Sequence, residues 1–361
     1  MEIPKSLKIA ILDDYQNAAA PYFDKFKALG HDVVGFPDTL LPYNHLSTPQ
    51  STKDALQKRL EPFHVLVTTR ERTPLPSALL QALPNLRLIL TNGKRNAAID
   101  MEACREQGVA ILTVMARPNP NPHAVDGTTE HIIALVLALA RNIASDDANV
   151  KAGGWQSASF SSALSGKTLG VVGLGRLGRT VARILHVAFG MKVIAWSQNL
   201  TQDKADEQAV QAGLPAETDG EKTFRAVRKG ELFAEADVVS VHLVLSERTA
   251  GIITGADLGR MKPSAFFVNT ARGPLVVERD LLDVLLRGGI RGAALDVFEL
   301  EPLPGDSEWR STEWGKNGSS HVLLTPHTGY VDQETITGWY EDQGQLLEEW
   351  ITSGTLRNRL A

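Results

Sequence analysis

The stretch that decides the fold is TLGVVGLGRLG at residues 168–178. Its apolar first half predicts a strand, and GLGRLG, a G-x-G-x-x-G motif, then opens an amphipathic segment. The order strand, motif, helix is typical of a dinucleotide-binding unit. In such a unit Gly173 permits a sharp turn, Gly175 lets the backbone approach a pyrophosphate, and Gly178 allows the helix to pack closely on the strand.

The first residues of that helix, Arg176 and Leu177, present backbone N–H groups and the positive end of the helix dipole to phosphates. A glycine turn without a ligand is the alternative. The strand before the motif, the helix to Phe189 and a second apolar run at Lys192–Trp196 together favour the nucleotide site. We therefore expect a nicotinamide dinucleotide, NAD or NADP, as the cofactor.

The turn after the second strand bears on the choice between these two cofactors. An NAD enzyme carries an acidic residue there, about 20 residues past the motif, to hold the ribose hydroxyls. This chain has Ser197, Gln198 and Asn199 instead, which we expect to contact the cofactor. The missing carboxylate removes repulsion against a 2′-phosphate, but no arginine stands in the turn and the nearest lysine is Lys204. The choice stays open, with a slight lean toward NADP.

Short apolar runs alternate with helical segments on both sides of the motif. A long, nearly all-round apolar helix is expected at Ala124–Asn142 and a last helix at Asp332–Ile351. Polar segments at Pro215–Lys229 and Gly305–Ser320 are interpreted as surface excursions. Further strands are expected at 8–12, 64–68, 86–90, 237–242, 265–269, 292–295 and 321–324, with a helix at 74–83. Alternation of this kind predicts an α/β fold with doubly wound parallel sheets.

Three motifs follow later strands, where an open parallel sheet binds its ligands. The first is Asn269-Thr270-Ala271-Arg272-Gly273. The second begins at Asp296 and ends in Glu301-Pro302, and the third is Thr325-Pro326-His327-Thr328-Gly329. We expect Arg272, Glu301 and His327 to converge beside the nicotinamide. Taken singly, each of these side chains is more often a surface or structural residue.

With these motifs in this order, the chain resembles the D-isomer-specific 2-hydroxyacid dehydrogenases. The resemblance extends over essentially the whole chain, from Ile11-Leu12-Asp13-Asp14 through Thr91-Asn92-Gly93 to the late motifs. It implies a Rossmann-type nucleotide domain inserted into a flavodoxin-like substrate domain. The expected bounds are 119–327 for the nucleotide domain and 1–118 with 328–361 for the substrate domain.

The resemblance also assigns roles to residues. Arg272 binds and polarises the substrate, His327 is the acid/base, and Glu301 is its carboxylate partner. Histidine suits this role because its pKa lies near working pH, and a carboxylate favours the imidazolium. The backbone around Gly93, Lys94 and Arg95 would hold the substrate carboxylate. The cofactor contacts implied by the resemblance are His242, Leu243, Thr270, Ala271 and Asp296. The reaction implied is reduction of a 2-oxo acid to the D-2-hydroxy acid, and a homodimer is the family expectation.

Two residues depart from the family pattern. Val244 stands where a proline usually follows the His-Leu pair, and Tyr330 stands where a small residue is common and narrows the expected site. Lys94 and Arg95 make the loop after Gly93 more basic than in many relatives, which suits either a second anionic group on the substrate or a solvated surface.

A nucleotide-sensing, corepressor-like protein on the same fold is the main alternative, since fold does not fix function. A formate dehydrogenase is disfavoured by Glu301, and a short-chain dehydrogenase by the lack of a Tyr-x-x-x-Lys motif near the expected catalytic helix. His131 is interpreted as structural.

Composition fits an enzyme of this kind and argues against other classes. The net charge is −5 and no basic run appears, which disfavours nucleic acid as a partner. Cys104 is the one cysteine, so no disulfide forms within the chain, and the spacing of the histidines predicts no metal site. No signal sequence or membrane span is apparent, and a cytoplasmic enzyme is expected.

Overall fold

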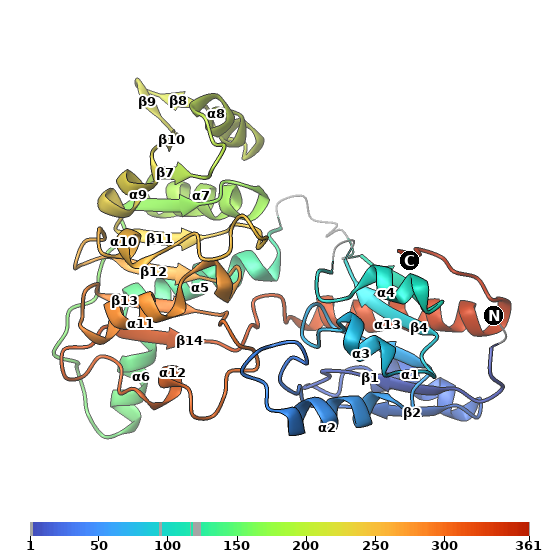
Figure 1. Ribbon diagram of the computed structural model, residues 1–361. Helices are drawn as coiled ribbons and strands as arrows, with labels where there is room; N and C mark the ends of the chain where they lie inside the picture. The colour runs from blue at the N-terminus through green and yellow to red at the C-terminus, as the bar shows by residue number, and fades with distance from the viewer. Residues whose placement is uncertain (1–2, 94–95, 116, 118–123, 361) are drawn as a thin grey trace. The chain divides into compact units, whose positions relative to one another are not determined.

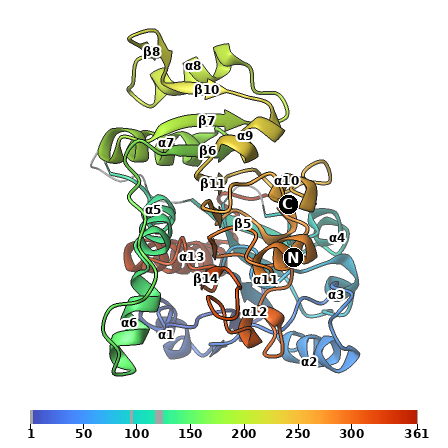
Figure 2. The same cartoon turned by 90° about the vertical axis from the view of Figure 1, so that its left-hand side faces the viewer.

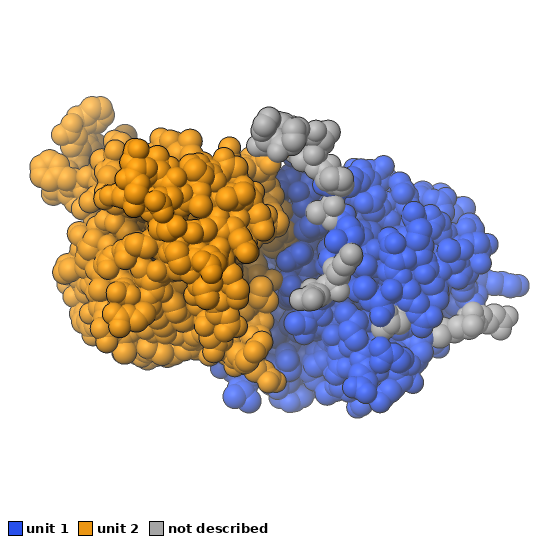
Figure 3. Space-filling model, turned by 90° about the horizontal axis from the view of Figure 1, so that it is seen from above, with its two compact units in different colours: residues 1–122, 300–302, 331–361 blue, residues 123–299, 303–330 orange. Residues whose placement is uncertain are grey.

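The computed structural model describes residues 3–93, 96–115, 117 and 124–360. The chain forms two compact units, which Figure 3 shows in two colours. Unit 1 comprises residues 1–122, 300–302 and 331–361, and unit 2 comprises residues 123–299 and 303–330. Unit 2 is thus inserted into unit 1 along the chain, as the expected fold class requires. The assignment of a substrate domain and a nucleotide domain, with bounds at 118/119 and 327/328, stays a prediction.

Unit 1 is built on a five-stranded parallel sheet with the order β2-β1-β3-β4-β5. This is the flavodoxin-like order of a doubly wound fold. The strands are β1 (Lys8–Ile11), β2 (Asp32–Gly35), β3 (Val65–Val67), β4 (Leu88–Asn92) and β5 (Ala110–Val114). The helices are α1 (Ala20–Ala28), α2 (Gln50–Leu60), α3 (Ser77–Gln81), α4 (Met101–Glu106) and α13 (Gln333–Ser353).

Both faces of this sheet are covered, which explains why its central strands are continuous apolar runs. Leu56 of α2, Leu79 of α3 and Cys104 of α4 share one buried cluster with Leu66 and Ile89 of the sheet. The C-terminal helix α13 returns to pack on β4 and β5, and it also contacts α1 (Figure 1). Burial raises the pKa of the Cys104 thiol to about 12, which makes it an inert core residue.

Unit 2 is built on a seven-stranded parallel sheet with the order β10-β7-β6-β11-β12-β13-β14. The first six of these strands follow the 3-2-1-4-5-6 order of a Rossmann fold. The strands are β6 (Thr168–Val172), β7 (Lys192–Trp196), β10 (Phe224–Ala226), β11 (Val238–Val241), β12 (Phe266–Asn269), β13 (Gly292–Leu295) and β14 (His321–Leu324). A small hairpin, β8 (Glu217–Thr218) with β9 (Glu221–Lys222), precedes β10.

Helices cover both faces of the second sheet (Figure 2). On one face lie α5 (Gly127–Ala140) and α7 (Arg176–Phe189), and on the other lie α9 (Lys229–Glu235), α10 (Gly255–Leu258) and α11 (Glu278–Leu286). The remaining helices are α6 (Ile143–Lys151), α8 (Gln202–Gln211), α12 (Glu308–Ser311) and the 3₁₀ turn η1 (Gly273–Leu275). Helix α5 begins where it does because the Asp126 carboxylate caps it, accepting the Thr129 N–H at 2.8 Å.

The prediction of two surface excursions is confirmed for most of their residues, which are exposed or half-buried, and is wrong for a short element within each. Residues 224–226 form β10, which pairs with β7 as the edge strand of the sheet. The second segment contains α12, whose Trp309 is 2% exposed and packs on Phe298. Strand β10 and helix α12 are too short, and lie in too polar a stretch of sequence, to show a periodic pattern of apolar residues that would have predicted them. The helix expected at 74–83 is shorter, since it begins only after Pro76.

Within the described residues, no helix is long and apolar enough to cross a membrane. The described part of the chain also has no group of three or more histidine, cysteine or acidic side chains placed to hold a metal ion.

Candidate active site

The parallel strands of unit 2 all end at one edge of their sheet. The backbone register places the last residues of neighbouring strands side by side across β7, β6, β11, β12, β13 and β14. An open sheet of this kind binds ligands where the strand order reverses, which is between β6 and β11. The turns that start at this edge carry most of the predicted site: they begin at Gly173, Ser197, His242, Thr270, Asp296 and Thr325.

The three motif glycines do three different things in the turn after β6. Gly173 has a φ of +103°, and a Cβ there would lie 3.0 Å from the backbone of His242 and Leu243. A Cβ at Gly178 would lie 2.2 Å from the carbonyl oxygen of Gly173, so only glycine lets α7 approach the strand. At Gly175, no atom of the described residues lies within 4 Å of the same position. In a Rossmann fold the pyrophosphate of the dinucleotide binds at this open position of the turn.

Helix α7 starts directly at this opening, with Gly175 as its N-cap. Its first intrahelical bond runs from the Arg179 N–H to the Gly175 carbonyl at 2.9 Å, so the N–H groups of the first turn are available for an anion. The Arg176 guanidinium pairs with Asp126, the cap of α5. Burial raises the pKa of Asp126, but the bonds from Arg176 and Thr129 lower it more. These features fit the pyrophosphate of a dinucleotide, and its contacts with Arg176 and Leu177 stay a prediction.

The turn after β7 carries no carboxylate. Its backbone closes with a bond from the Leu200 N–H to the Ser197 carbonyl at 3.1 Å. The Lys204 ammonium donates to the Asn199 carbonyl at 3.0 Å, and Lys229 lies 5.5 Å from the centre of the Trp196 ring. Lys204 therefore adds a cation beside a turn whose own residues are neutral, whereas the charge of Lys229 is paired with Asp257 at 2.6 Å.

The turn after β11 lies against the glycine turn. The Nε2 atom of His242 is buried and has no hydrogen-bond partner among the described residues. Burial lowers the pKa of His242 to about 4, so its ring is neutral at physiological pH. Leu243 follows, and Val244 is exposed.

The turn after β12 presents Arg272 through the buried side chain of Asn269. The Asn269 amide donates to the Arg272 carbonyl at 3.0 Å and accepts the Ala271 N–H at 3.1 Å. Arg272 donates to the Ala271 carbonyl at 2.7 Å. A Cβ at Gly273 would lie 2.0 Å from the carbonyl of Phe298, so this glycine brings the β12 turn against the turn after β13.

The turn after β14 presents His327 in the left-handed backbone region, with a φ of +52°. Few residues other than glycine adopt this conformation, and those that do cluster at functional sites. The ring of Tyr330 meets the His327 ring edge to face, with the ring centres 5.7 Å apart. Asp296 is buried beneath this turn and accepts the N–H groups of Thr328 and Gly329 at 2.9 and 3.0 Å.

Glu301 and His327 belong to different units of the chain. Glu301 is partly buried in the short 300–302 segment that groups with unit 1, whereas His327 lies in unit 2. The pairing of these two side chains stays a prediction.

The predicted substrate loop follows β4 of unit 1. Gly93 has a φ of +83° and is pinned by bonds from its N–H to the Val114 carbonyl and from the Thr113 hydroxyl to its own carbonyl, both 2.8 Å. Lys94 and Arg95 lie outside the described residues. The sequence reasoning missed Arg70, whose Nη1 lies 3.5 Å from the place of a Cβ on Gly93. Its position directly after β3, in TTRERT, is the signal that could have found it.

Arg70 is held by two asparagines that flank the same loop. Its N–H donates to Asn92 at 3.1 Å, and its carbonyl accepts from Asn96 at 2.8 Å. The φ of Arg70 is +54°, so these bonds stabilise an uncommon backbone conformation. The carboxyl ends of β3 and β4 thus place an arginine beside Gly93.

Comparisons with known proteins agree with this arrangement. Residues 133–329 match the model of the D-isomer specific 2-hydroxyacid dehydrogenase, NAD binding domain. The chain is 36% identical over 261 residues to a D-3-phosphoglycerate dehydrogenase of Mycobacterium leprae, covering 72% of this chain and 44% of that one. It is 32% identical to a hydroxypyruvate reductase of Thermotoga maritima, covering 77% of this chain and 81% of that one.

A solved structure is similar over nearly its full length. The crystal structure of a phosphoglycerate oxidoreductase from Vibrio cholerae superposes with a TM-score of 0.78 at 35% identity, covering 96% of this chain and 99% of that one. The chain therefore belongs to the D-isomer specific 2-hydroxyacid dehydrogenase family. It spans less than half the length of the D-3-phosphoglycerate dehydrogenase of Mycobacterium leprae that it matches.

Proposed function

We propose that this chain is a nicotinamide-dependent oxidoreductase that interconverts a 2-oxo acid and the D-2-hydroxy acid. The observation that carries the proposal is one edge of the unit 2 sheet, where an open glycine turn, Arg272 and His327 follow β6, β12 and β14. Family membership supports the same reaction class. The dinucleotide would lie on Gly173, Gly175 and the first turn of α7, which fit its pyrophosphate.

When bound, the reduced nicotinamide supplies a hydride to the carbonyl carbon of the 2-oxo acid. The residues of this chain do the rest. Arg272 binds the substrate carboxylate with its planar guanidinium and polarises the ketone. His327 donates a proton to the ketone oxygen as negative charge develops on it. Glu301 hydrogen-bonds the His327 ring and favours its protonated form.

The remaining predicted contacts position the reactants. Backbone N–H groups of Lys94 and Arg95, next to Gly93, hold the substrate carboxylate, since the N–H of Gly93 itself is bonded to the Val114 carbonyl. The cation of Arg70 beside Gly93 supports anion binding there. His242, Leu243, Thr270, Ala271 and Asp296 line the cofactor site, as do Ser197, Gln198 and Asn199 at the ribose. The lack of a carboxylate after β7 and the ammonium of Lys204 at Asn199 favour NADP slightly over NAD.

The experiment that tests the function is a panel of 2-oxo acids assayed with NADH and with NADPH. The panel runs from glyoxylate and hydroxypyruvate to phenylpyruvate and includes a phosphorylated acid, because relatives of the chain are named for hydroxypyruvate and phosphoglycerate. Oxidation of either cofactor that depends on one acid supports the proposal. Tight nucleotide binding without turnover of any acid would move the assignment to the nucleotide-sensing alternative.

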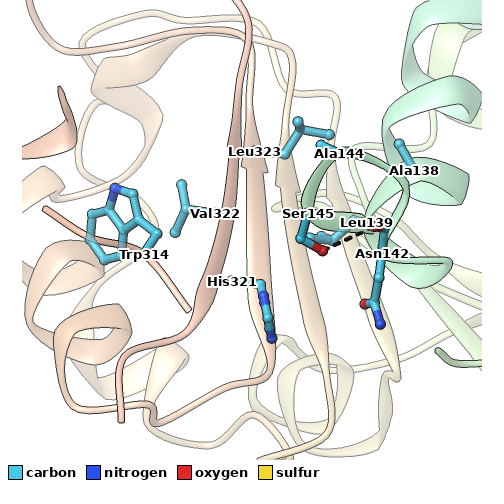
Figure 4. A pocket seen from close by; sticks show the side chains of 9 residues that line it. All are labelled: Ala138, Leu139, Asn142, Ala144, Ser145, Trp314, His321, Val322 and Leu323. Atoms are coloured by element: carbon cyan, nitrogen blue, oxygen red, sulfur yellow. Dashed lines mark hydrogen bonds between the residues drawn. The ribbon is translucent and has the colours of Figure 1, made fainter. Parts of the chain in front are cut away.

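A homodimer through unit 2 is part of the proposal. Large apolar side chains stand exposed on and after α6, with Trp155 78% and Phe160 90% accessible. A cavity of about 240 Å³ lies between the start of α6 and the edge strand β14 (Figure 4). Ala144 and Ser145 line it on one side, and His321, Val322 and Leu323 on the other. Exposed apolar surface of this kind marks an interface. Light scattering of the purified chain should give twice the mass of the 39.2 kDa monomer.

A further inference from the structure

The turn that carries His327 is short and its conformation is uncommon for histidine. The His327 N–H donates to the Thr325 carbonyl at 3.1 Å, and the φ of +52° turns the chain back on itself. A residue other than glycine keeps its backbone in this left-handed conformation only where the surrounding structure holds it there. The contacts that fix the turn therefore determine where the His327 ring stands.

The Asp296 carboxylate supplies those contacts from beneath the turn. Its Oδ1 atom accepts the Thr325 hydroxyl at 2.6 Å and the Thr328 N–H at 2.9 Å. Its Oδ2 atom accepts the Gly329 N–H at 3.0 Å. Three donors on both sides of His327 thus converge on one carboxylate that is 1% exposed.

His131 of α5 completes the arrangement from the other side. Its Nε2 atom lies 3.1 Å from the Thr325 hydroxyl oxygen and 3.3 Å from Asp296 Oδ1. Because the Thr325 hydroxyl gives its only proton to Asp296, its oxygen accepts from His131, so Nε2 carries a hydrogen. Burial raises the pKa of Asp296, but the bonds from His131, Thr325 and Thr328 outweigh it and hold this pKa below its usual value.

The turn packs closely against these two side chains. A Cβ at Gly329 would lie 3.2 Å from Asp296 Oδ2 and 3.4 Å from the Cδ2 atom of His131. A side chain at this position would therefore require the turn or the pair to shift by a few tenths of an ångström.

We propose that His131 and Asp296 act as a positioning pair, which clamps the 325–329 turn and so fixes the ring of His327 for proton transfer. The proposal rests on the proposed role of His327 as the acid/base. His131, which the sequence analysis interprets as structural, thereby has a role in catalysis. Asp296 has this role in addition to the predicted contact with the cofactor. His131 acts through Asp296 and Thr325 and does not itself touch the reacting atoms.

Two substitutions of His131 separate its hydrogen bond from its bulk. Leucine fills similar space without a donor, whereas glutamine can place an amide N–H near the position of Nε2. We expect His131→Leu to lower kcat by about 10- to 100-fold, with the KM for the 2-oxo acid and the Kd for the nucleotide within about threefold, because small misplacements of a reacting group have effects of this size. His131→Gln should recover kcat to within about fivefold of wild type.

Amide hydrogen exchange provides a readout that needs no turnover. The N–H groups of Thr328 and Gly329 should exchange faster in His131→Leu than in wild type, and His131→Gln should lie close to wild type. His186→Leu is the matched control, because His186 also makes one hydrogen bond in unit 2, from Nδ1 to the Met191 carbonyl at 2.8 Å. It should change neither kcat nor the exchange of the turn.

Each outcome decides a separate point. Faster exchange with a lower kcat, both restored by glutamine, supports the positioning pair. Unchanged exchange in His131→Leu overturns the clamp, and faster exchange with unchanged kcat overturns its role in positioning His327. If the wild type reduces no 2-oxo acid with either cofactor, the proposed function fails, while the exchange rates still decide whether His131 clamps the turn.

Discussion

The two sheets of this chain share one architecture and differ at the same place, the turn where strand order reverses. In unit 1 that turn follows β1 and is filled by its own side chains. Asp13 is 1% exposed and accepts the hydroxyls of Thr39 at 2.5 Å and Thr73 at 2.9 Å, while Asp14 caps the approach to α1 through the N–H groups of Ala18 and Ala19. In unit 2 the turn follows β6 and consists largely of glycines.

The difference shows why topology alone does not assign a site. Both turns lie where a doubly wound sheet can bind a ligand. The carboxylate of Asp13 occupies the turn of unit 1, whereas the place beside Gly175 in unit 2 is open. We therefore expect the side chains at the switch point, and not the order of the strands, to decide which unit binds the nucleotide.

The largest expected effect comes from removing the proposed acid/base from the open edge. His327→Ala should lower kcat by about 10³-fold or more, because a positioned general acid contributes on this order. Nucleotide binding, which depends on the glycine turn, should stay within about threefold of wild type by calorimetric titration. Unchanged turnover would remove His327 from the mechanism.

A pair of glycine substitutions tests whether the open turn is built for packing, for a ligand, or for both. Gly178→Ala should destabilise unit 2 by about 3 kcal/mol, since the added Cβ meets a backbone oxygen that cannot move freely. Gly175→Ala should leave the melting temperature unchanged and weaken nucleotide binding by about tenfold or more, because its Cβ enters the open space. Equal nucleotide affinity in Gly175→Ala and wild type would show that no pyrophosphate lies there.

The closed turn of unit 1 can be tested through its buried carboxylate. Burial raises the pKa of Asp13 to about 6 from 3.8, although Thr39, Thr73 and Arg72 lower it in part. The folded state therefore binds this proton more tightly than the unfolded state, and the contribution of Asp13 to stability falls as pH rises from about 4 to about 6.

Asp13→Asn stays neutral across this window and keeps an acceptor for the two threonines. The stability of the variant relative to wild type should therefore increase by about 2 kcal/mol between pH 4 and pH 7. Urea unfolding of both proteins across this range measures the difference. A difference that does not depend on pH would contradict the view that Asp13 titrates inside the closed turn.

The smallest effect is expected from restoring a carboxylate at the open edge. Ser197→Asp should raise the ratio of kcat/KM for NADH over NADPH by about tenfold, because the carboxylate binds ribose hydroxyls and repels a 2′-phosphate. Gln208→Asp on α8 adds the same charge farther along the chain and should leave the ratio unchanged. If the ratio of kcat/KM for NADH over NADPH does not rise, Ser197 does not lie in the turn that selects between the two cofactors.

The sequence predicted the strands of unit 2 well because their patterns are strong. Residues 168–172, 192–196, 292–295 and 321–324 form strands with the predicted bounds. Strand β10 was missed because Phe224-Arg225-Ala226 is a three-residue edge strand without periodicity, and only its pairing with β7 defines it.

The sequence predicted those residues of the candidate site that belong to a recognisable motif. Residues next to a strand end, such as Arg272 and His327, could be placed at the sheet edge from sequence alone. Arg70 also follows a strand end and could have been placed in the same way, although its contact with Gly93 could not be predicted. His131 could not be placed, because its relevance depends on a contact with Asp296, which lies far away along the chain. The pairing of Glu301 with His327 stays a prediction from the family resemblance.

The central claim is that the open edge of unit 2 reduces a 2-oxo acid to one enantiomer, and product analysis tests it most directly. The acid with the highest kcat/KM in the panel is reduced to completion, and the product is resolved by chiral chromatography. We predict that the product is the D-2-hydroxy acid, and that the purified D enantiomer, but not the L enantiomer, supports reduction of the oxidised cofactor in the reverse direction. Formation of the L enantiomer, or of a racemate, would contradict it.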